Sequence, residues 1–249
     1  MRYFLKLAYN GTSYHGWQRQ PNALGVQQVI EDALSIITRE KISIVGAGRT
    51  DTGVHARQMY AHFDYNEIKD ETKFLSSLNK LVGNDISLFS LLKVKPEAHA
   101  RFDALERSYS YYISLVKNPF SFSFSHRLLR MPDIEQMNQA ATILLDTSDF
   151  TSFAKLHTDV VNNICNVKTA EWKVYPDKEM LVFTITANRF LRNMVRAVVG
   201  TLLEVGQHKL TLPQFKEVIA RRDRCEAGMS MPAKGLFLEK IIYPQEIFI

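Results

Sequence analysis

The chain has 249 residues and a mass of 28.6 kDa, a length that suits one large domain or two small halves. The composition, with 46% hydrophobic and 23% charged residues, is typical of an ordinary folded protein. No apolar run reaches the roughly 18 to 20 residues that a membrane helix needs, and Lys6 interrupts the first apolar stretch. We therefore expect a cytoplasmic protein without a membrane partner. Its two cysteines lack C-x-x-C spacing and a nearby histidine, which argues against a disulfide scaffold or a metal site, and the net charge of +5 is weak evidence for any partner.

The first part of the chain is predicted to form a βαββ unit. Residues 3–9 alternate with a period near two and end at an Asn-Gly turn, which predicts a strand. Apolar residues at helical spacing predict an amphipathic helix over residues 26–38, and residues 42–45 and 58–65 are typical of strands. A glycine-rich loop between the last two strands carries the carboxylate of Asp51.

The rest of the chain again mixes strands with helices. Alternating or apolar runs predict strands at residues 86–94, 107–116, 166–175, 180–187 and 235–243. Periodic apolar residues predict helices over residues 133–145, 189–206 and 213–222.

This pattern predicts an α+β fold in two halves. A boundary near residues 117–132, with Pro119 and Pro132, separates a first half over residues 1–117 from a second half over residues 118–249. The phenylalanine and serine residues of "FSFSFSH" (120–126) have the most unusual local composition of the chain, and no motif accounts for them.

The predicted helix over residues 189–206 places arginines on one stripe. Arg189, Arg192, Arg196 and Gly200 lie at i, i+3, i+7 and i+11, and the remaining surface is strongly apolar. A buried stripe of arginines needs an anion, which is either a carboxylate of the chain or a phosphate of a ligand. The wider segment 186–224 has eight Lys and Arg against three acids, which suits either a polyanion or a solvated helix surface.

The loop "VGAGRTDTGVH" (45–55) has letters in common with three kinds of site. A phosphate-binding loop needs Lys and Ser or Thr after the second glycine, where this chain has Val54 and His55. An aspartic protease needs two aspartates that share a proton, and the nearest second match to Asp51-Thr52-Gly53 is Asp146-Thr147-Ser148, so only a dimer could supply the pair. Two interpretations remain for Asp51, an anionic nucleophile or a residue that closes a turn. The arginine stripe favours the first, because Asp51 is the natural carboxylate of the chain to pair with it and a neighbouring arginine lowers the pKa of a carboxylate.

Five segments, taken together, resemble the TruA-type tRNA pseudouridine synthases. They occur in the family's order and extend from the first strand to the last: "LAYNGTSYHGWQRQP" (7–21), "AGRTDTGVHA" (47–56), "FDALERSYSYYI" (102–113), "NRFLRNMVRAVVG" (188–200) and "KGLFLEKIIYP" (234–244). The resemblance implies a pseudouridine synthase fold of two ferredoxin-like α+β halves, with their sheets joined into one central, mostly antiparallel sheet.

The resemblance also implies an activity and a set of site residues. Uridines 38, 39 and 40 of the tRNA anticodon stem-loop would be isomerised to pseudouridine after base flipping, with neither cofactor nor metal. Asp51 would be the catalytic nucleophile, Tyr109 would pack on the target base, and Arg196 would pair with Asp51. Arg49 would displace the base and contact RNA, and Leu236 would form an apolar wall of the pocket.

Further implications concern RNA binding and assembly. Arg101, Arg107, Arg189 and Arg192 are candidates for RNA contacts, and family members bind tRNA as homodimers. The chain departs from the family pattern at Thr52, where alanine is usual, at Ser108, where a basic residue is common, and in "MPAKGL" (231–236). These changes bear on the fit of RNA and leave every reacting group in place. A non-catalytic RNA-binding module and a dimeric aspartic protease are the competing hypotheses.

Overall fold

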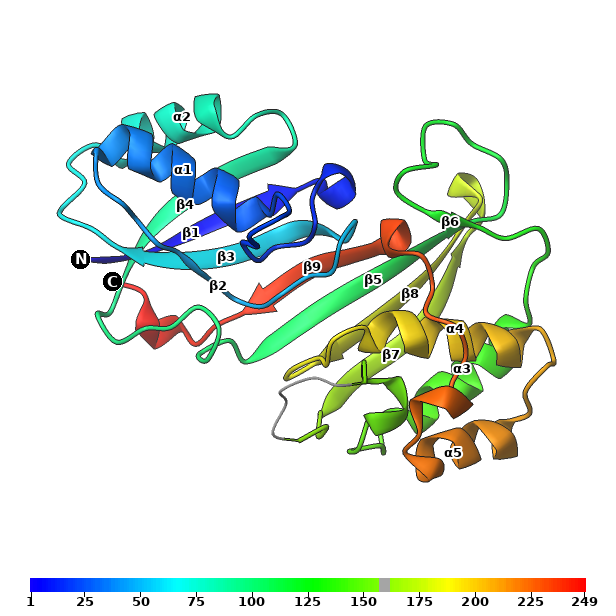
Figure 1. The fold of residues 1–249 in the computed structure, drawn as a ribbon. Helices are drawn as coiled ribbons and strands as arrows, with labels where there is room; N and C mark the ends of the chain where they lie inside the picture. Colours follow the sequence, from blue (N-terminus) through cyan, green and yellow to red (C-terminus); the bar gives the residue numbers. More distant parts are fainter. Residues whose placement is uncertain (157–161) are drawn as a thin grey trace. The chain divides into compact units, whose positions relative to one another are not determined.

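The computed structural model describes residues 1–156 and 162–249 and separates the chain into two units (Figure 1). The first unit comprises Met1–Leu105 and Leu238–Ile249, and the second comprises Glu106–Phe237. Each unit combines antiparallel strands with helices, so the predicted α+β class with a mostly antiparallel sheet is confirmed.

The division differs from the expected halves, 1–117 and 118–249. The chain passes between units at Leu105 instead of residue 117, so the tyrosine-rich strand lies wholly in the second unit. The final segment then returns to the first unit within the last strand, because its side chains complete the core of that unit.

The sheet of the first unit is built around a buried N-terminal strand. Its elements are β1 (Arg2–Tyr9), β2 (Val45–Gly46), β3 (His55–Asp64), β4 (Ile86–Val94), most of β9 (Leu236–Ile242), and the helices α1 (Val26–Thr38) and α2 (Glu71–Leu81). β1 pairs antiparallel with β3 and with β4, with Leu5 opposite Ala61 and Leu91. The strand order β4-β1-β3-β9 therefore places the N-terminal strand inside the sheet.

Both faces of β1 are covered, because α1 and α2 lie on one face and the C-terminal residues on the other (Figure 1). Phe4 makes edge contacts with Tyr243 and Phe248, with ring centroids 5.2 and 6.2 Å apart. Tyr3 and Leu5 are also fully buried. Burial on both faces explains why the last residues of the chain belong to the first unit.

The second unit packs three helices beside an antiparallel sheet (Figure 1). Its elements are β5 (Glu106–Ser114), β6 (His126–Arg127), α3 (Ile134–Ile143), β7 (Val167–Tyr175), β8 (Met180–Ala187), α4 (Met194–Gly206) and α5 (Leu212–Arg221). β5 and β7 flank β8, while the short β6 runs parallel to β5. Trp172 packs on Phe183 across the sheet at 4.9 Å, and almost every residue of α4 is buried.

Two predicted elements differ most from the observed ones. The helix expected over 189–206 begins only at Met194, because Asn193 adopts a left-handed conformation with φ 68°. Arg189 and Arg192 therefore precede α4, and the predicted four-residue stripe on one helix is wrong. The strand expected over 42–45 is reduced to Val45–Gly46, because the backbone of Ile44 bonds to side chains of α1.

Candidate functional site

Asp51 lies in the loop between β2 and β3, at a turn that its own backbone closes. The carbonyl oxygen of Asp51 accepts a hydrogen bond from the amide of Val54 at 3.1 Å. Gly53, inside the turn, has φ 77°, a left-handed conformation that favours glycine. The Asp51 residue is half-buried. Its backbone is therefore ordered by a turn while the residue keeps contact with solvent.

The segment that follows β1 tethers this loop on both sides of the aspartate. The amide of Trp17 donates to the carbonyl of Thr50 at 3.3 Å, and the amide of Gly53 donates to the carbonyl of Tyr14 at 3.2 Å. The hydroxyls of Tyr9 and Thr50 are 2.8 Å apart. Neighbours on either side of Asp51 are thus bonded to a second, distant stretch of chain, which restricts where the carboxylate can move.

Glycines make this close approach of two backbones feasible. A Cβ atom on Gly11 would lie 2.0 Å from the carbonyl oxygen of Val54, and one on Gly16 would lie 2.2 Å from that of Thr50. The amide of Gly11 also donates to Nδ1 of the buried His55 at 3.0 Å. The "NGTSYHGW" segment therefore serves as a support for the aspartate loop, and His55, the first residue of β3, accepts a hydrogen bond from this support.

Two glycines before Asp51 have opposite surroundings. A Cβ on Gly46 would overlap the Trp17 indole at 2.4 Å, and Trp17 is buried with 2% exposure. A Cβ on Gly48 would meet no atom within 4 Å. Gly46 is therefore required by packing, whereas Gly48 borders open space.

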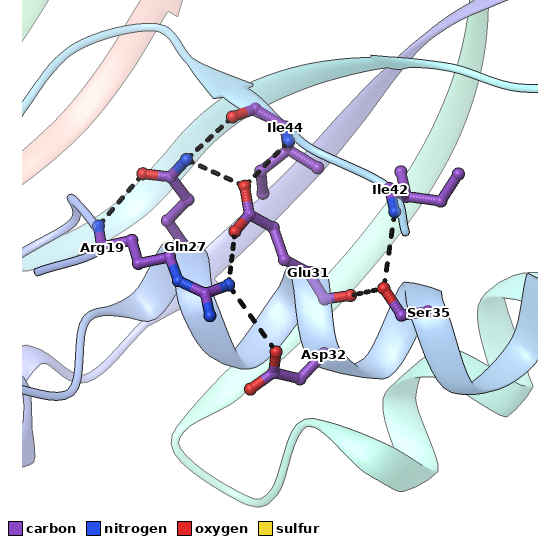
Figure 2. A network of polar contacts seen from close by, with 7 residues as sticks. All are labelled: Arg19, Gln27, Glu31, Asp32, Ser35, Ile42 and Ile44. Carbon is purple, nitrogen blue, oxygen red and sulfur yellow. Dashed lines mark hydrogen bonds and ion pairs between the residues drawn. The ribbon is translucent and has the colours of Figure 1, made fainter. Parts of the chain in front are cut away.

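A buried carboxylate on α1 holds the residue before β2, the strand that leads into the loop (Figure 2). Glu31 accepts hydrogen bonds from the amide of Ile44 and from the side chain of Gln27, both at 3.0 Å, and pairs with Arg19 at 3.2 Å. Gln27 in turn donates to the carbonyl of Ile44 at 3.0 Å. Asp32 is a more distant and exposed partner of Arg19, at 3.8 Å. The sequence interpretation missed Glu31, whose only signal is an acid next to the apolar stripe of the helix.

The loop with Arg101 is supported by two histidines of the first unit. Nδ1 of His62 accepts a hydrogen bond from the amide of Ala100 at 3.1 Å, and Nδ1 of His99 accepts one from the amide of Arg101 at 3.1 Å. Burial, with smaller contributions from nearby His99 and Arg2, lowers the pKa of His62 from 6.5 to about 4. His62 is thus neutral near pH 7, the form in which Nδ1 can accept, and Arg101 itself is exposed.

The three tyrosines of β5 have different roles in the second unit. Tyr111 is fully buried and donates its hydroxyl to the carbonyl of Pro232 at 2.8 Å. Tyr112 packs edge-on against Phe237, with ring centroids 5.1 Å apart. Tyr109 is half-buried, with its ring edge-on to Phe190 at 5.1 Å. Tyr109 and Tyr112 are thus both half-buried with packed rings, whereas Tyr111 is fully buried.

Arg196 connects α4 to the segment that ends at Leu236. Its Nε donates to the carbonyl of Met231 at 2.6 Å, and the amide of Met231 donates to the carbonyl of Arg196 at 3.1 Å. Gly200, one turn later, allows the carbonyl of Met229 to approach, since a Cβ there would lie 1.8 Å from that oxygen. Arg196 is half-buried and Leu236 is buried at the start of β9.

The other predicted arginines are spread over exposed loops and a strand end. Arg107 donates to the carbonyl of Asn188 at 2.8 Å, and Arg189 contacts the side chain of Asn162 at 3.4 Å. Arg192 and Arg49 are exposed. These side chains are accessible, but the structure does not gather them into one helical stripe.

Over residues 1–156 and 162–249, no helix is both long and apolar enough to span a bilayer. In the same ranges, no cluster of three or more His, Cys, Asp or Glu side chains is arranged to hold a metal ion.

Comparison with known proteins agrees with this arrangement. A family model described as tRNA pseudouridine synthase matches residues 7–103 and 140–244. "tRNA pseudouridine synthase A" of Bacteroides fragilis is 53% identical over 99% of this chain and 98% of its own. Proteins of the same name from Bacteroides thetaiotaomicron and Clostridium acetobutylicum are 52% and 38% identical, covering 99% and 96% of this chain and 92% and 98% of their own.

The fold and these matches define an RNA-modifying isomerase. The chain belongs to the tRNA pseudouridine synthase family, whose members isomerise uridine in tRNA. The sequence Asp51-Thr52-Gly53 is therefore not a mark of an aspartic protease.

Proposed function

We propose that this protein isomerises uridines 38, 39 and 40 in the anticodon stem-loop of tRNA, with Asp51 as the nucleophile toward a flipped uridine. The observation that carries the proposal is the support of the Asp51 loop. Hydrogen bonds to Trp17 and Tyr14 hold the residues on either side of a half-buried aspartate. Such restraint is what a nucleophile needs, because a fixed position lowers the entropic cost of reaching the reacting atom.

The reaction is balanced without an added reagent. The bond between N1 of uracil and C1′ of ribose breaks, the base turns, and C5 forms the new bond to C1′. The proton on C5 is released and N1 gains one, so no atom is oxidised or reduced. A carboxylate can form a covalent intermediate that keeps one partner attached while the base turns. Since the reacting atoms are inaccessible in a stacked helix, the nucleotide must be extruded first.

Other residues have proposed roles toward the same uridine. Tyr109 packs on the base, which its half-buried ring beside Phe190 supports. Leu236 supplies an apolar wall, and Arg196 pairs with Asp51. Arg49, exposed two residues before Asp51, displaces the base from its stack. The matched family motifs support these roles.

RNA binding and assembly complete the proposal. Arg101, Arg107, Arg189 and Arg192 contact phosphates of the tRNA, and the protein acts as a homodimer in the cytoplasm without a cofactor. Exposed Arg101 and Arg192 fit phosphate contacts. Binding through such contacts should weaken as salt rises.

A position-resolved tritium assay tests this function. A tRNA transcript tritiated at C5 of its uridines is incubated with the protein, next to transcripts in which uridines 38, 39 and 40 are replaced by cytidine. We expect tritium release from the first transcript and none above background from a transcript lacking all three uridines. Equal release from both would overturn the assignment to the anticodon stem-loop, and no release from either would overturn the activity.

A further inference from the structure

An exposed loop of the second unit, residues 117–131, presents aromatic and aliphatic side chains to solvent. We call it the phenylalanine loop. Phe120 is 92% exposed, Phe122 is 66% exposed and Leu129 is 84% exposed. A cluster of large apolar side chains at the surface is a common sign of a binding site. None of the residues assigned above accounts for this loop.

The charge of the loop is of one sign. Between Glu106 and Asp133 the sequence contains no carboxylate, while Lys117, Arg127 and Arg130 are exposed cations of the loop. The ammonium of Lys234 lies 3.6 Å from the centroid of the Phe122 ring. Aromatic faces among cations suit single-stranded nucleic acid, because bases stack on the rings and phosphates bind the cations.

The base of the loop is attached to the segment with Leu236. Phe124 packs on Phe237, the residue after Leu236, with ring centroids 6.3 Å apart. Lys234, two residues before Leu236, carries the cation that contacts Phe122. The exposed rings thus extend from the segment assigned to the wall of the uridine pocket.

Hydrogen bonds order the loop. In the parallel β5–β6 ladder Ile113 is opposite His126, and the amide of Leu128 donates to the carbonyl of Ser114 at 3.0 Å. Within the loop, the amide of Phe124 donates to the carbonyl of Ser121 at 3.0 Å. The phenylalanines are therefore presented by an anchored segment, which reduces the ordering cost on binding.

We propose that the phenylalanine loop binds the tRNA substrate next to the flipped uridine, with Phe120 and Phe122 stacked on unstacked bases and with Lys117, Arg127 and Arg130 on phosphates. The inference rests on the proposed function, since it places the loop next to a pocket that holds the target nucleotide. A second copy of the chain is disfavoured as the occupant, because it carries the same positive loop and a net charge of +5.

The test compares two double variants, Phe120→Ala with Phe122→Ala, and Arg127→Gln with Arg130→Gln. Affinity for a fluorescently labelled tRNA transcript is measured by anisotropy over a series of salt concentrations. Each lost stack should weaken binding by roughly five-fold or more. The arginine variant should reduce the slope of log affinity against log salt by about two, one for each phosphate contact. Phe89→Ala, which removes a 53% exposed phenylalanine of β4, is the matched control and should leave affinity unchanged.

Further measurements separate this inference from the proposed function. If the parent protein releases tritium while the phenylalanine variant binds tRNA within two-fold of the parent, the loop inference is overturned and the function stands. If the parent releases none, the proposed function falls.

Two controls identify a different occupant. Sedimentation that shows a changed oligomeric state for the phenylalanine variant would assign the loop to protein assembly. Parent binding to phosphatidylserine vesicles that disappears in this variant, with tRNA affinity unchanged, would assign the loop to a membrane surface. Either result overturns the inference. Restored tRNA affinity in a Phe120→Trp, Phe122→Trp variant would support stacking.

Discussion

Replacing Glu31 with alanine removes the carboxylate that joins α1 to the strand before the Asp51 loop (Figure 2). The amide of Ile44, buried in the parent, would lose its acceptor, at a cost of about 1–3 kcal/mol. The ion pair with Arg19 adds at most about 1 kcal/mol, because that arginine side chain is half exposed and screened by water. The free energy of unfolding of the first unit should therefore fall by roughly 1–4 kcal/mol.

Tryptophan fluorescence can measure this change in the first unit. The chain has two tryptophans, Trp17 in the first unit and Trp172 in the second, so a Trp172→Phe background leaves one reporter next to the aspartate loop. Urea unfolding in that background should show a lower midpoint for Glu31→Ala. Asp32→Ala is the matched control, because that side chain is 59% exposed and lies 3.8 Å from Arg19.

The comparison of Glu31→Ala with Asp32→Ala distinguishes the loss of a buried hydrogen-bond acceptor from the loss of an exposed charge. Asp32→Ala should change the free energy of unfolding by less than about 0.5 kcal/mol, as is usual for exposed positions. Glu31→Gln keeps an acceptor for Ile44 and should fall between the parent and Glu31→Ala. If Glu31→Ala is no less stable than Asp32→Ala, the carboxylate does not hold the strand, and the reasoning is refuted.

Three more predictions follow from individual residues. The pKa of His62 is about 4 in the folded protein and near 6.5 when unfolded, so the unfolded chain takes up this proton first. The free energy of unfolding should therefore fall as pH is lowered from about 6.5 toward 4. In His62→Asn, which retains a hydrogen-bond acceptor, the urea midpoint should depend less on pH over that window. An unchanged pH dependence of the midpoint would contradict the low pKa of His62. Burial raises the pKa of the Cys165 thiol to about 11, whereas Cys225 is exposed. Iodoacetamide should therefore label Cys225 alone in the native protein and both cysteines in urea. Labelling of Cys165 in the native protein would disprove its burial. Gly200→Ala should destabilise the protein by more than about 1 kcal/mol, because the new Cβ atom would lie 1.8 Å from a backbone oxygen. Gly48→Ala, which adds a Cβ atom in open space, should leave the melting temperature near that of the parent and slow tritium release. Equal melting curves for both variants would contradict the packing argument.

Elements with a strong apolar period were predictable from sequence. The helix over 26–38 and the strands over 86–94 and 180–187 were predicted with the observed bounds, because buried apolar side chains recur along each of them. The helix α2 was not predicted, since Leu78 is its one fully buried residue and its start depends on the Asp70 cap, which accepts from the amide of Lys73. Local pattern cannot reveal an element that is stabilised by so few apolar contacts.

The candidate site was predictable only in part. The motifs identified Asp51, but its supports come from Gly11 and Gly16, which act through contacts with backbone about 35 to 45 positions away in the chain. The arginine stripe was wrong because Asn193, an ordinary residue in the sequence pattern, adopts a left-handed conformation, so the helix begins only at Met194, after Arg189 and Arg192. The pairing of Arg196 with Asp51 stays a prediction.

The central claim is that Asp51 is the nucleophile, and single-turnover tritium release tests it most directly. Excess enzyme is mixed with C5-tritiated tRNA for the parent, for Asp51→Asn, and for Asp146→Asn, which alters an exposed aspartate also followed by threonine. We predict that Asp51→Asn retains its melting temperature and tRNA affinity but releases no tritium above background, while Asp146→Asn matches the parent. Release by Asp51→Asn at the rate of the parent would contradict the account.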